Sequence, residues 1–397
     1  MITKHLLRSA FNFALGQAEH NCALFNGRCQ NHTSVNNFYE PCDNNQWTSG
    51  FWPGQLWLCY EYSHDEKFCH AANDLAETFL YRIEKKIEVD HHDMGFLYTP
   101  SCTASWMLSK NTDAKKAALL AADQLLLRFQ PKGGFLQAWG EMGKSENYRF
   151  IIDCLMNTPL LFWASKETGS TRYADIALTH IETCMKYSIR KDGSTYHTFF
   201  MDSETGLPSH GATCQGYKDD SFWARGQAWA VYGTALAYRY TKKIEYLEKF
   251  QKVLSFYESK LPEDFVPYWD MIFTEGVTEP RDSSSAAIVS CGLLEMASLL
   301  EKESQTLLND QSTAKNLLNE AQKYKASARQ MIESLINNYA VKDETVSNGL
   351  LLHGTYSKKS PYNTCTPEGV DECTTWGDYF YLEALTRLNN PEWKSYW

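Results

Sequence analysis

Residues 90–95, DHHDMG, place two acids around two adjacent histidines. Carboxylates and imidazoles bind metal ions and also serve as general acids and bases, so this stretch is a candidate site for either chemistry. The same four residues, Asp90, His91, His92 and Asp93, also suit a polar turn between two helices. The remainder of the sequence has to distinguish these three interpretations.

A further acid, Asp153, lies in RFIIDCLMNTPLLFWA, where its neighbours are mostly apolar. Burial in such surroundings raises the pKa of a carboxyl toward the range useful to a general acid. The structural alternative is an Asp that caps a helix by accepting backbone N–H groups. If Asp93 faces a second Asp from another helical hairpin, the two form a carboxylate pair, which is the working arrangement of sugar hydrolysis.

Aromatic residues gather near these acids in the sequence. Trp47 lies in NNQWTSGFWPGQLW, and Arg225 and Trp229 lie four apart in DDSFWARGQAWAVYG, on one face of a predicted helix. A guanidinium beside an aromatic ring suits a uronate, because the cation binds the carboxylate while the ring stacks under the sugar. The structural alternative is that Arg225 pairs with Asp219 or Asp220 at the start of its helix.

A metal site is disfavoured by the spacing of the candidate ligands. Adjacent side chains such as His91 and His92 do not readily aim at one ion, and no HxxxH motif or third ligand stands at a metal-binding spacing. The chain also has no GxGxxG loop, P-loop or GxSxG motif. We therefore predict no metal and no cofactor.

The elements that must position these residues are helical. Hydrophobic periodicity of the helical kind dominates the chain and predicts twelve helices. Their expected ranges are 3–19, 50–64, 67–86, 99–110, 112–128, 152–168, 171–188, 222–240, 243–258, 284–301, 313–338 and 375–389.

The predicted helices fall into pairs joined by short links, with long polar and aromatic loops between the pairs. Six such hairpins predict an all-α (α/α)6 toroid, in which inner helices line a central cavity and loops at one end cover the active site. No Pro- or Gly-rich linker divides the chain, so we expect one domain over 1–397. An α-solenoid is the alternative, although the sequence has no repeat of fixed period.

Bulk composition excludes several classes of protein. The net charge of −10 argues against a nucleic-acid partner, which would require a basic face. No stretch approaches the roughly 18 apolar residues of a membrane span, so we expect no membrane partner. The N-terminus does not resemble a signal peptide, and the twelve cysteines are scattered without a CxxC motif. A cytoplasmic location is expected on these grounds.

Six segments in order resemble the unsaturated glucuronyl hydrolases, glycoside hydrolase family 88. They are DHHDMGFLY, IIDCLMNTPLLFWAS, YHTFFMDSETG, HGATCQGYKDDSFWARGQAWAVYG, VPYWDM and TTWGDYFYLEALTRL. The resemblance extends from about Trp47 to the C-terminus. It implies an (α/α)6 fold, in agreement with the twelve helices predicted from periodicity.

The resemblance also implies a reaction. Enzymes of this family remove the 4,5-unsaturated uronic acid that polysaccharide lyases leave at the non-reducing end of glycosaminoglycan-type fragments. They hydrate the C4=C5 vinyl ether, and the resulting hemiketal opens and expels the remaining sugar. Asp153 matches the acid/base that protonates C4 and helps water to add at C5. Asp93 matches the second acid, which holds a sugar hydroxyl and stabilises the developing charge.

Further positions carry over as substrate-binding residues. His197, Gln215, Arg225, Trp229 and Trp47 match positions that line the subsite for the unsaturated sugar, with the two tryptophans stacking on its ring. On this interpretation Asp93 is the functional residue of DHHDMG, and the histidines support the loop.

The segment GTYSKKSPYN (354–363) lies where some family members bind a sulphate on the second sugar. Ser357 and Ser360 are suitably spaced for that role, whereas Tyr362 stands where a lysine is expected. Lys358 or Lys359 is a possible substitute, and solvated surface lysines are the alternative.

The expected partners are unsaturated uronyl disaccharides or short oligosaccharides from hyaluronan, chondroitin, heparin or a bacterial glycan, all of which stay open at this point. An unsaturated rhamnogalacturonyl hydrolase acting on pectin fragments is the closest alternative. Sugar 2-epimerases share a similar toroid but work through histidine pairs, for which His91, His197 and His210 are poor candidates. A glycan-binding protein without activity would not require an acid in the apolar segment around Asp153.

Overall fold

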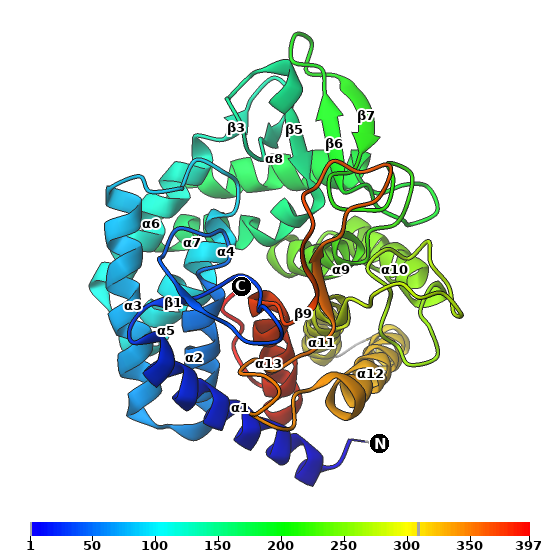
Figure 1. Cartoon of the computed structure of the whole chain (residues 1–397). Helices are drawn as coiled ribbons and strands as arrows, with labels where there is room; N and C mark the ends of the chain where they lie inside the picture. Colours follow the sequence, from blue (N-terminus) through cyan, green and yellow to red (C-terminus); the bar gives the residue numbers. More distant parts are fainter. Residues whose placement is uncertain (1, 308–309) are drawn as a thin grey trace.

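The helices form a ring of two layers in residues 2–307 and 310–397, which the computed structural model describes (Figure 1). Outer helices bury one stripe, and inner helices are buried on almost every side, as a layer enclosed by another layer requires. The outer layer comprises α1 (Lys4–Phe25), α3 (Glu66–Glu84), α6 (Thr112–Leu126), α8 (Arg172–Tyr187), α10 (Ile244–Ser259) and α12 (Gln311–Ser334). The inner layer comprises α2 (Phe51–Ser63), α4 (Met94–Tyr98) with α5 (Ala104–Ser109), α7 (Thr158–Thr168), α9 (Ala224–Thr241), α11 (Ser283–Thr306) and α13 (Thr375–Asn389).

The ring closes between the two ends of the chain. Helix α13 packs against α2 and α1, while α9, α11 and α13 pack side by side. The C-terminus lies inside the ring (Figure 1), where Trp397 stacks on Phe380 and donates its Nε1–H to Glu383 at 2.8 Å. The predicted all-α (α/α)6 toroid is confirmed. Its sixth pair of outer and inner helices is formed by α1 and α13, from the two ends of the chain.

Helix α11 shows why the inner layer is apolar. The expectation that no stretch approaches a membrane span was wrong for this helix, because its length and composition alone would allow it to cross a membrane. However, 89% of its most apolar window is buried inside the protein. Such burial is expected of a core helix that has neighbours on every side.

All long loops precede inner helices, so they collect at the N-terminal ends of that layer. In the described residues these loops carry short strands in four antiparallel sheets. The strands are β1 (Cys29–Gln30), β2 (Pro41–Cys42), β3 (Phe129–Gln130), β4 (Phe135–Leu136), β5 (Arg149–Ile151), β6 (Thr198–Met201), β7 (Pro208–Ala212), β8 (Gly354–Ser357) and β9 (Glu368–Glu372). Figure 1 shows the β5–β6–β7 sheet at the top and the orange β8–β9 hairpin rising toward it.

Two predicted helices are interrupted, and each contains a proline. The helix expected at 99–110 begins at Met94 and is interrupted by a π-helical turn at Thr99–Thr103. Pro100 has no N–H and its ring would clash with the carbonyl one turn earlier, so the regular hydrogen-bond pattern breaks there. The helix expected at 152–168 is divided into a 3₁₀ segment, Ile152–Met156, and α7, with Pro159 in the first turn of α7.

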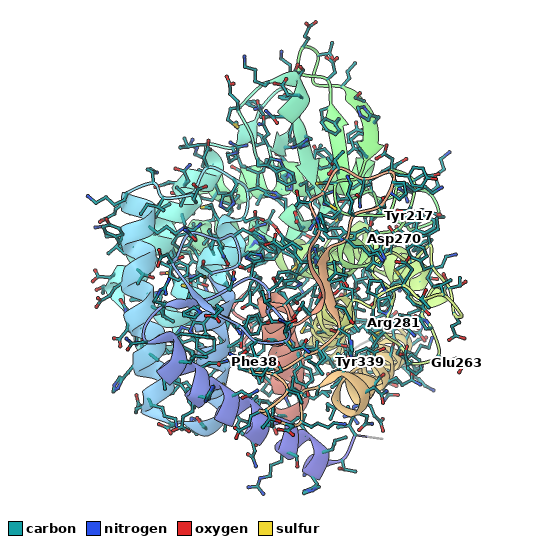
Figure 2. The ribbon with its side chains drawn as sticks, in the orientation of Figure 1. Phe38, Tyr217, Glu263, Asp270, Arg281 and Tyr339 are labelled. Carbon is teal, nitrogen blue, oxygen red and sulfur yellow. The ribbon has the colours of Figure 1, made fainter. Side chains whose placement is uncertain are left out.

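The VPYWDM segment anchors one loop of the site through Asp270. Its carboxylate accepts hydrogen bonds from the Tyr217 and Phe222 N–H groups at 2.7 and 3.0 Å and from the Ser221 hydroxyl at 2.5 Å. Figure 2 shows Tyr217 and Asp270 beside one another. The loop that carries Gln215 is therefore held by a buried carboxylate with several donors.

Candidate active site

A cavity of about 430 Å³ lies among the long loops, at the N-terminal ends of the inner helices. It contains seven of the nine residues predicted for the site, namely Trp47, Asp93, Asp153, Gln215, Arg225, Trp229 and Ser357. His92, Trp139, Cys214, Trp223, Tyr356, Thr364, Cys365, Thr366 and Glu368 complete its wall. The predicted residues thus come together from separate helices and loops.

The two acids meet at one imidazole. The Nε2 atom of His92 lies 3.4 Å from Asp93 Oδ1 and 3.6 Å from Asp153 Oδ1. One ligand-type atom from each of the three residues lies within 4.8 Å of the other two. The side chains of Asp93 and Asp153 are only 13% and 15% exposed. This arrangement places two carboxyl groups and a neutral or charged imidazole at one point of the cavity wall.

The surroundings move the pKa values of the two acids apart. Burial raises the pKa of Asp153 well above its ordinary value, and the nearby charge of Asp93 raises it further, against the opposing effects of Arg225 and backbone N–H groups. Burial also opposes ionisation of Asp93, but His92, His91 and the Asn157 amide together lower its pKa below the ordinary value. Burial lowers the pKa of His92 to about 4. The surroundings therefore favour the protonated form of Asp153, the ionised form of Asp93 and the neutral form of His92.

Asp93 is positioned by the start of α4. It is the N-cap residue of that helix but makes no capping hydrogen bond, so its carboxylate is free to face the cavity. A Cβ on Gly95 would lie 2.4 Å from the Asn157 Cα, so only glycine lets α4 approach the start of α7 this closely. The last residue of DHHDMG is thus as necessary to the geometry as the acids.

Asp153 is positioned by the 3₁₀ segment Ile152–Met156. The expectation that it heads a long apolar helix was wrong, because α7 begins only at Thr158. The structural interpretation holds in part, since the backbone N–H groups of Asp153 and Cys154 act on the carboxyl. Oδ1 nevertheless has no hydrogen-bond partner among the described residues, so one oxygen of the acid remains free for chemistry.

Arg225 supplies a buried positive charge to the wall. Its guanidinium donates to the carbonyls of Thr355 and Tyr356 at 2.6 and 2.7 Å and lies 3.4 Å from Asp282. The structural alternative, a pairing with Asp219 or Asp220, is therefore wrong, because the carboxylate that reaches Arg225 is Asp282 at the start of α11. Two of its three closest partners are neutral carbonyls, so the positive charge is only partly compensated.

Aromatic rings surround the cation and the acids. Trp47 stacks on Trp376, with ring centroids 5.3 Å apart, and its Nε1–H donates to the Tyr356 hydroxyl at 3.2 Å. Trp229 is only 1% exposed and packs against Phe96 at 5.0 Å. Both predicted tryptophans line the cavity, but Trp229 presents much less of its surface to a ligand.

Gln215 lines the cavity and donates to the Tyr356 carbonyl at 3.1 Å. His197 does not belong to the wall. It is 4% exposed, its Nδ1 accepts the Cys214 N–H at 3.1 Å, and its ring packs edge-on against Trp223. In this structure His197 therefore holds the loop that carries Gln215.

Of the two serines predicted to bind sulphate, only one lines the cavity. Ser357, at the end of β8, lines the cavity. Ser360 does not, because its hydroxyl donates to the Tyr217 carbonyl at 2.5 Å and accepts the N–H groups of Tyr362 and Asn363. Tyr362 is 62% exposed.

The two lysines of that segment are already engaged. Lys358 pairs with Glu279 at 2.9 Å, and Lys359 donates to the Asn363 carbonyl at 2.6 Å. Neither lysine lines the cavity. Their positions outside the cavity favour the alternative of surface lysines, although each is engaged by a protein partner and not freely solvated.

Sequence reasoning missed several members of the wall. His92 was assigned a supporting role, yet it is the residue that contacts both acids. Trp139 lies in a polar loop, and an aromatic residue in such a segment was the available signal; in the structure it is 37% exposed. Trp139 and Tyr356 also line an adjoining groove of about 650 Å³ together with Trp47 and Asp93. The cavity therefore continues into a space for further sugar units.

His92, Asp93 and Asp153 are the set that could hold a metal ion among the described residues. The fit is poor, because metal ligands must be deprotonated and the pKa of Asp153 is raised. The absence of a metal stays a prediction. The expectation that the histidines support the loop agrees with the contact of His91, whose Nε2 lies 3.0 Å from the Glu88 carbonyl.

A helical toroid whose loop-covered cavity holds two carboxyls with divergent pKa values defines a class of sugar-cleaving enzymes. The model of Glycosyl Hydrolase Family 88 matches residues 22–370, and the chain belongs to that family. It is accordingly a glycoside hydrolase.

Relatives agree along the whole chain. An unsaturated chondroitin disaccharide hydrolase of Streptococcus pyogenes serotype M1 is 47% identical over 98% of this chain and 93% of its own. The crystal structure of an unsaturated glucuronyl hydrolase from Streptococcus agalactiae superimposes with a TM-score of 0.90, at 43% identity, covering 100% of this chain and 95% of that one. A mutant of the S. agalactiae enzyme complexed with dGlcA-GalNAc6S has a TM-score of 0.83 at 39% identity, covering 100% and 94%.

Proposed function

We propose that this enzyme removes the 4,5-unsaturated uronic acid from the non-reducing end of lyase-generated glycosaminoglycan-type oligosaccharides by hydrating the C4=C5 vinyl ether. The single observation that carries the proposal is the pair Asp93 and Asp153, whose pKa values lie on opposite sides of the ordinary one. A pair of titratable groups separated in this way supplies one acid and one anion at the same pH.

The spacing of the pair argues against an inverting glycosidase, while a retaining one, with roughly 5–5.5 Å between its carboxyls, is excluded by other features only. The nearest carboxyl oxygens are no more than 4.8 Å apart. Inverting glycosidases need roughly 6.5–9.5 Å between their carboxyls to hold the attacking water. A mechanism in which one acid performs both proton transfers needs no such gap.

The proposed steps use this chain's own groups. Asp153 donates its proton to C4, which leaves positive charge shared between C5 and the ring oxygen. The ionised Asp93 stabilises that charge and accepts a hydrogen bond from a sugar hydroxyl. Water then adds to C5 and gives its proton to the Asp153 carboxylate, which restores the acid. The hemiketal at C5 opens, and the bond to the remaining sugar breaks.

Binding of the uronate is assigned to the opposite wall. The partly compensated charge of Arg225 faces the same cavity as Asp153 and Gln215, and a carboxylate is the group that such a charge favours. Trp47 presents a ring face to the sugar, and Trp139, at the entrance to the groove, is suitably placed for the second sugar. Among possible substrates, unsaturated chondroitin disaccharides come first, because the S. pyogenes relative is named for them.

The first experiment follows the ultraviolet absorbance of the conjugated C4=C5 bond with a panel of unsaturated disaccharides, sulphated and unsulphated. Wild type should remove the absorbance. Asp153→Asn should lose at least about three orders of magnitude in kcat while still binding the disaccharide, because it removes the proton donor and little else. Binding is measured by calorimetry.

Each outcome discriminates. Activity only on pectin-derived unsaturated disaccharides would replace the proposal with the rhamnogalacturonyl alternative. Binding without turnover by the wild type would indicate a glycan-binding protein.

We also propose that residues 1–397 act as one catalytic domain in a reducing, cytoplasmic compartment, supported by the twelve free cysteines.

A further inference from the structure

Two buried histidines beneath the acid pair each have one nitrogen without a hydrogen-bond partner. They are His92, which is 1% exposed, and His180 on α8, which is 0% exposed. The unpartnered atoms are Nδ1 of His92 and Nε2 of His180. Buried imidazole nitrogens are rarely left unpaired, because each unpaired one loses its hydrogen bonds to water.

The hydrogen bonds on the far side of each ring determine which nitrogen carries the proton. Nδ1 of His180 accepts the Leu136 N–H at 3.0 Å, so its proton lies on Nε2. Nε2 of His92 faces the oxygens of Asp93 and Asp153, so its proton lies on that nitrogen. The two unpartnered atoms are therefore a donor on His180 and an acceptor on His92.

Several contacts place the two rings near one another. The backbone N–H of His92 donates to the Ala138 carbonyl at 3.0 Å, and His180 binds the Leu136 N–H two residues earlier on the same segment. Residues two apart in an extended segment direct their backbone groups to the same edge. Burial lowers the pKa of His180 to about 3, and the proximity of His92 lowers it further.

The inner face of α8 also reaches the catalytic acid. Cys184 lies one turn after His180 on the same helix, and the charge of Asp153 contributes to the raised pKa of its thiol. His180 thus belongs to the part of α8 that lies directly behind the acid pair.

We propose that His180 is a positioning residue for the reaction, linked through its Nε2–H to Nδ1 of His92 by one buried water. The link runs from the Leu136 N–H through His180 and His92 to the two carboxyls. It holds the His92 proton on Nε2, where it faces Asp93 and Asp153. The inference rests on the proposed roles of these two acids.

The consequence for the site follows from the hydrogen-bond inventory of imidazole. Without the link, the His92 proton is free to move to Nδ1, and an Nε2 lone pair then faces the carboxyls. An ionised Asp93 would lose a donor and meet a lone pair, which disfavours its charged form. The geometry for binding sugar would be unchanged, because His180 lies behind the wall and does not line the cavity.

Two substitutions separate the link from the packing role of His180. In His180→Asn the amide oxygen stands near the original Nδ1 and keeps the Leu136 N–H bonded, but no atom extends toward His92. In His180→Gln the side-chain nitrogen reaches approximately the original Nε2 position and preserves a donor toward His92. If His180 has only a packing role, His180→Asn should retain at least as much activity as His180→Gln.

We expect His180→Asn to lower kcat about tenfold with KM within twofold of wild type, and to move the acid limb of the kcat–pH profile upward by about half a pH unit. His180→Gln should recover most of kcat. In a His92→Gln background, His180→Asn should have no further effect, because the residue acts through His92. Equal, additive losses in both backgrounds would overturn the proposal.

A spectroscopic readout does not depend on turnover or on the folding of a variant. The ¹⁵N shifts of the wild-type imidazoles should show His92 protonated on Nε2, and His180→Asn should show a mixture of tautomers. A wild-type His92 protonated on Nδ1 refutes the link. If Asp153→Asn is inactive while His180→Asn matches wild type in rate and tautomer, only this inference fails. An active Asp153→Asn would instead remove the proposed function on which it rests.

Discussion

Nε2 of His92 lies between the two acids, 3.4 Å from an Asp93 oxygen and 3.6 Å from an Asp153 oxygen. Since the neutral ring has one proton at that nitrogen, it cannot satisfy two carboxylates equally. The asymmetry is completed by His91, whose Nδ1 lies 3.1 Å from Asp93 Oδ2. The surroundings therefore lower the pKa of Asp93 and raise that of Asp153, which favours the anion at Asp93 and the proton at Asp153.

The first prediction concerns pH. Activity requires Asp93 ionised and Asp153 protonated. Because the pKa of Asp93 is lowered and that of Asp153 is raised, kcat/KM should fall only below the ordinary Asp range on the acid side and well above that range on the basic side. The measurement is kcat/KM from pH 3 to 9, with circular dichroism to confirm folding. An acid limb near pH 6 would contradict the assignment of the anion to Asp93.

Neutralising Asp93 should lower the pKa of Asp153, because the nearby negative charge contributes to raising it. In Asp93→Asn the basic limb of the residual activity should therefore move to lower pH, together with a large fall in kcat. Asp90→Asn is the matched control, since Asp90 belongs to the same segment but is 74% exposed and pairs with Arg128. The control should keep the wild-type basic limb. A basic limb in Asp93→Asn that stays at the wild-type pH would show that the charge of Asp93 does not affect the pKa of Asp153.

Gly95→Ala should destabilise the fold, because the new Cβ would lie 2.4 Å from the Asn157 Cα and 2.8 Å from its carbonyl oxygen. Overpacking against backbone costs about 1–3 kcal/mol, which thermal unfolding should report as a lower Tm. Gly16→Ala on α1 is the control, because nothing lies within 4 Å of its added Cβ. That change should be neutral or stabilising. A Gly95→Ala protein as stable as wild type would show that α4 can move away from α7 freely.

The two tryptophans Trp139 and Trp229 should respond differently to replacement by Ala. Trp139 is 37% exposed at the cavity mouth, so its loss should raise KM about five- to tenfold, equivalent to about 1–1.4 kcal/mol, without changing Tm. Trp229 is 1% exposed, so its loss should cost about 3–5 kcal/mol of unfolding free energy. Steady-state kinetics measures KM and chemical denaturation measures stability for each variant. If Trp139→Ala lost stability and Trp229→Ala only raised KM, the assigned roles of the two residues would be wrong.

Sulphate preference should depend on Ser357 and not on Ser360. Ser357→Ala should change the ratio of kcat/KM between sulphated and unsulphated disaccharides, because Ser357 lines the cavity. Ser360→Ala should lower activity on both substrates alike, because its hydroxyl binds the backbone of its own segment and of Tyr217. Competition between the two disaccharides in one assay gives the ratio directly.

The helical ring was predictable because apolar residues recur with the helical period over most of the chain. The interruptions were not. Pro100 and Pro159 are tolerated near helix starts, so the sequence alone does not say whether a helix begins at such a proline or continues around it. The strands were missed because strands of two to five residues leave no alternation to detect.

The site was predictable where function requires an unusual residue in an unusual place, as with Asp153 among apolar neighbours and Arg225 beside Trp229. Residues that act through tertiary contacts were not. His180 lies on an ordinary amphipathic helix, and His92 gains its role only when Asp153 arrives from another hairpin. His197 and Ser360 show the opposite case, because their places in the sequence match a binding site while their side chains turn to the backbone.

The common direction of the inner helices gives the ring an electrical polarity. Each helix end at the loops carries roughly half a positive charge from its unpaired N–H groups, and these ends surround the cavity that also holds Arg225. A protein with a net charge of −10 would otherwise repel an acidic sugar over its whole surface. The inner-helix ends and Arg225 offset part of that repulsion at the cavity, which also carries the carboxyl groups of Asp93 and Glu368, so a uronide is favoured at the helix ends that hold the acid pair.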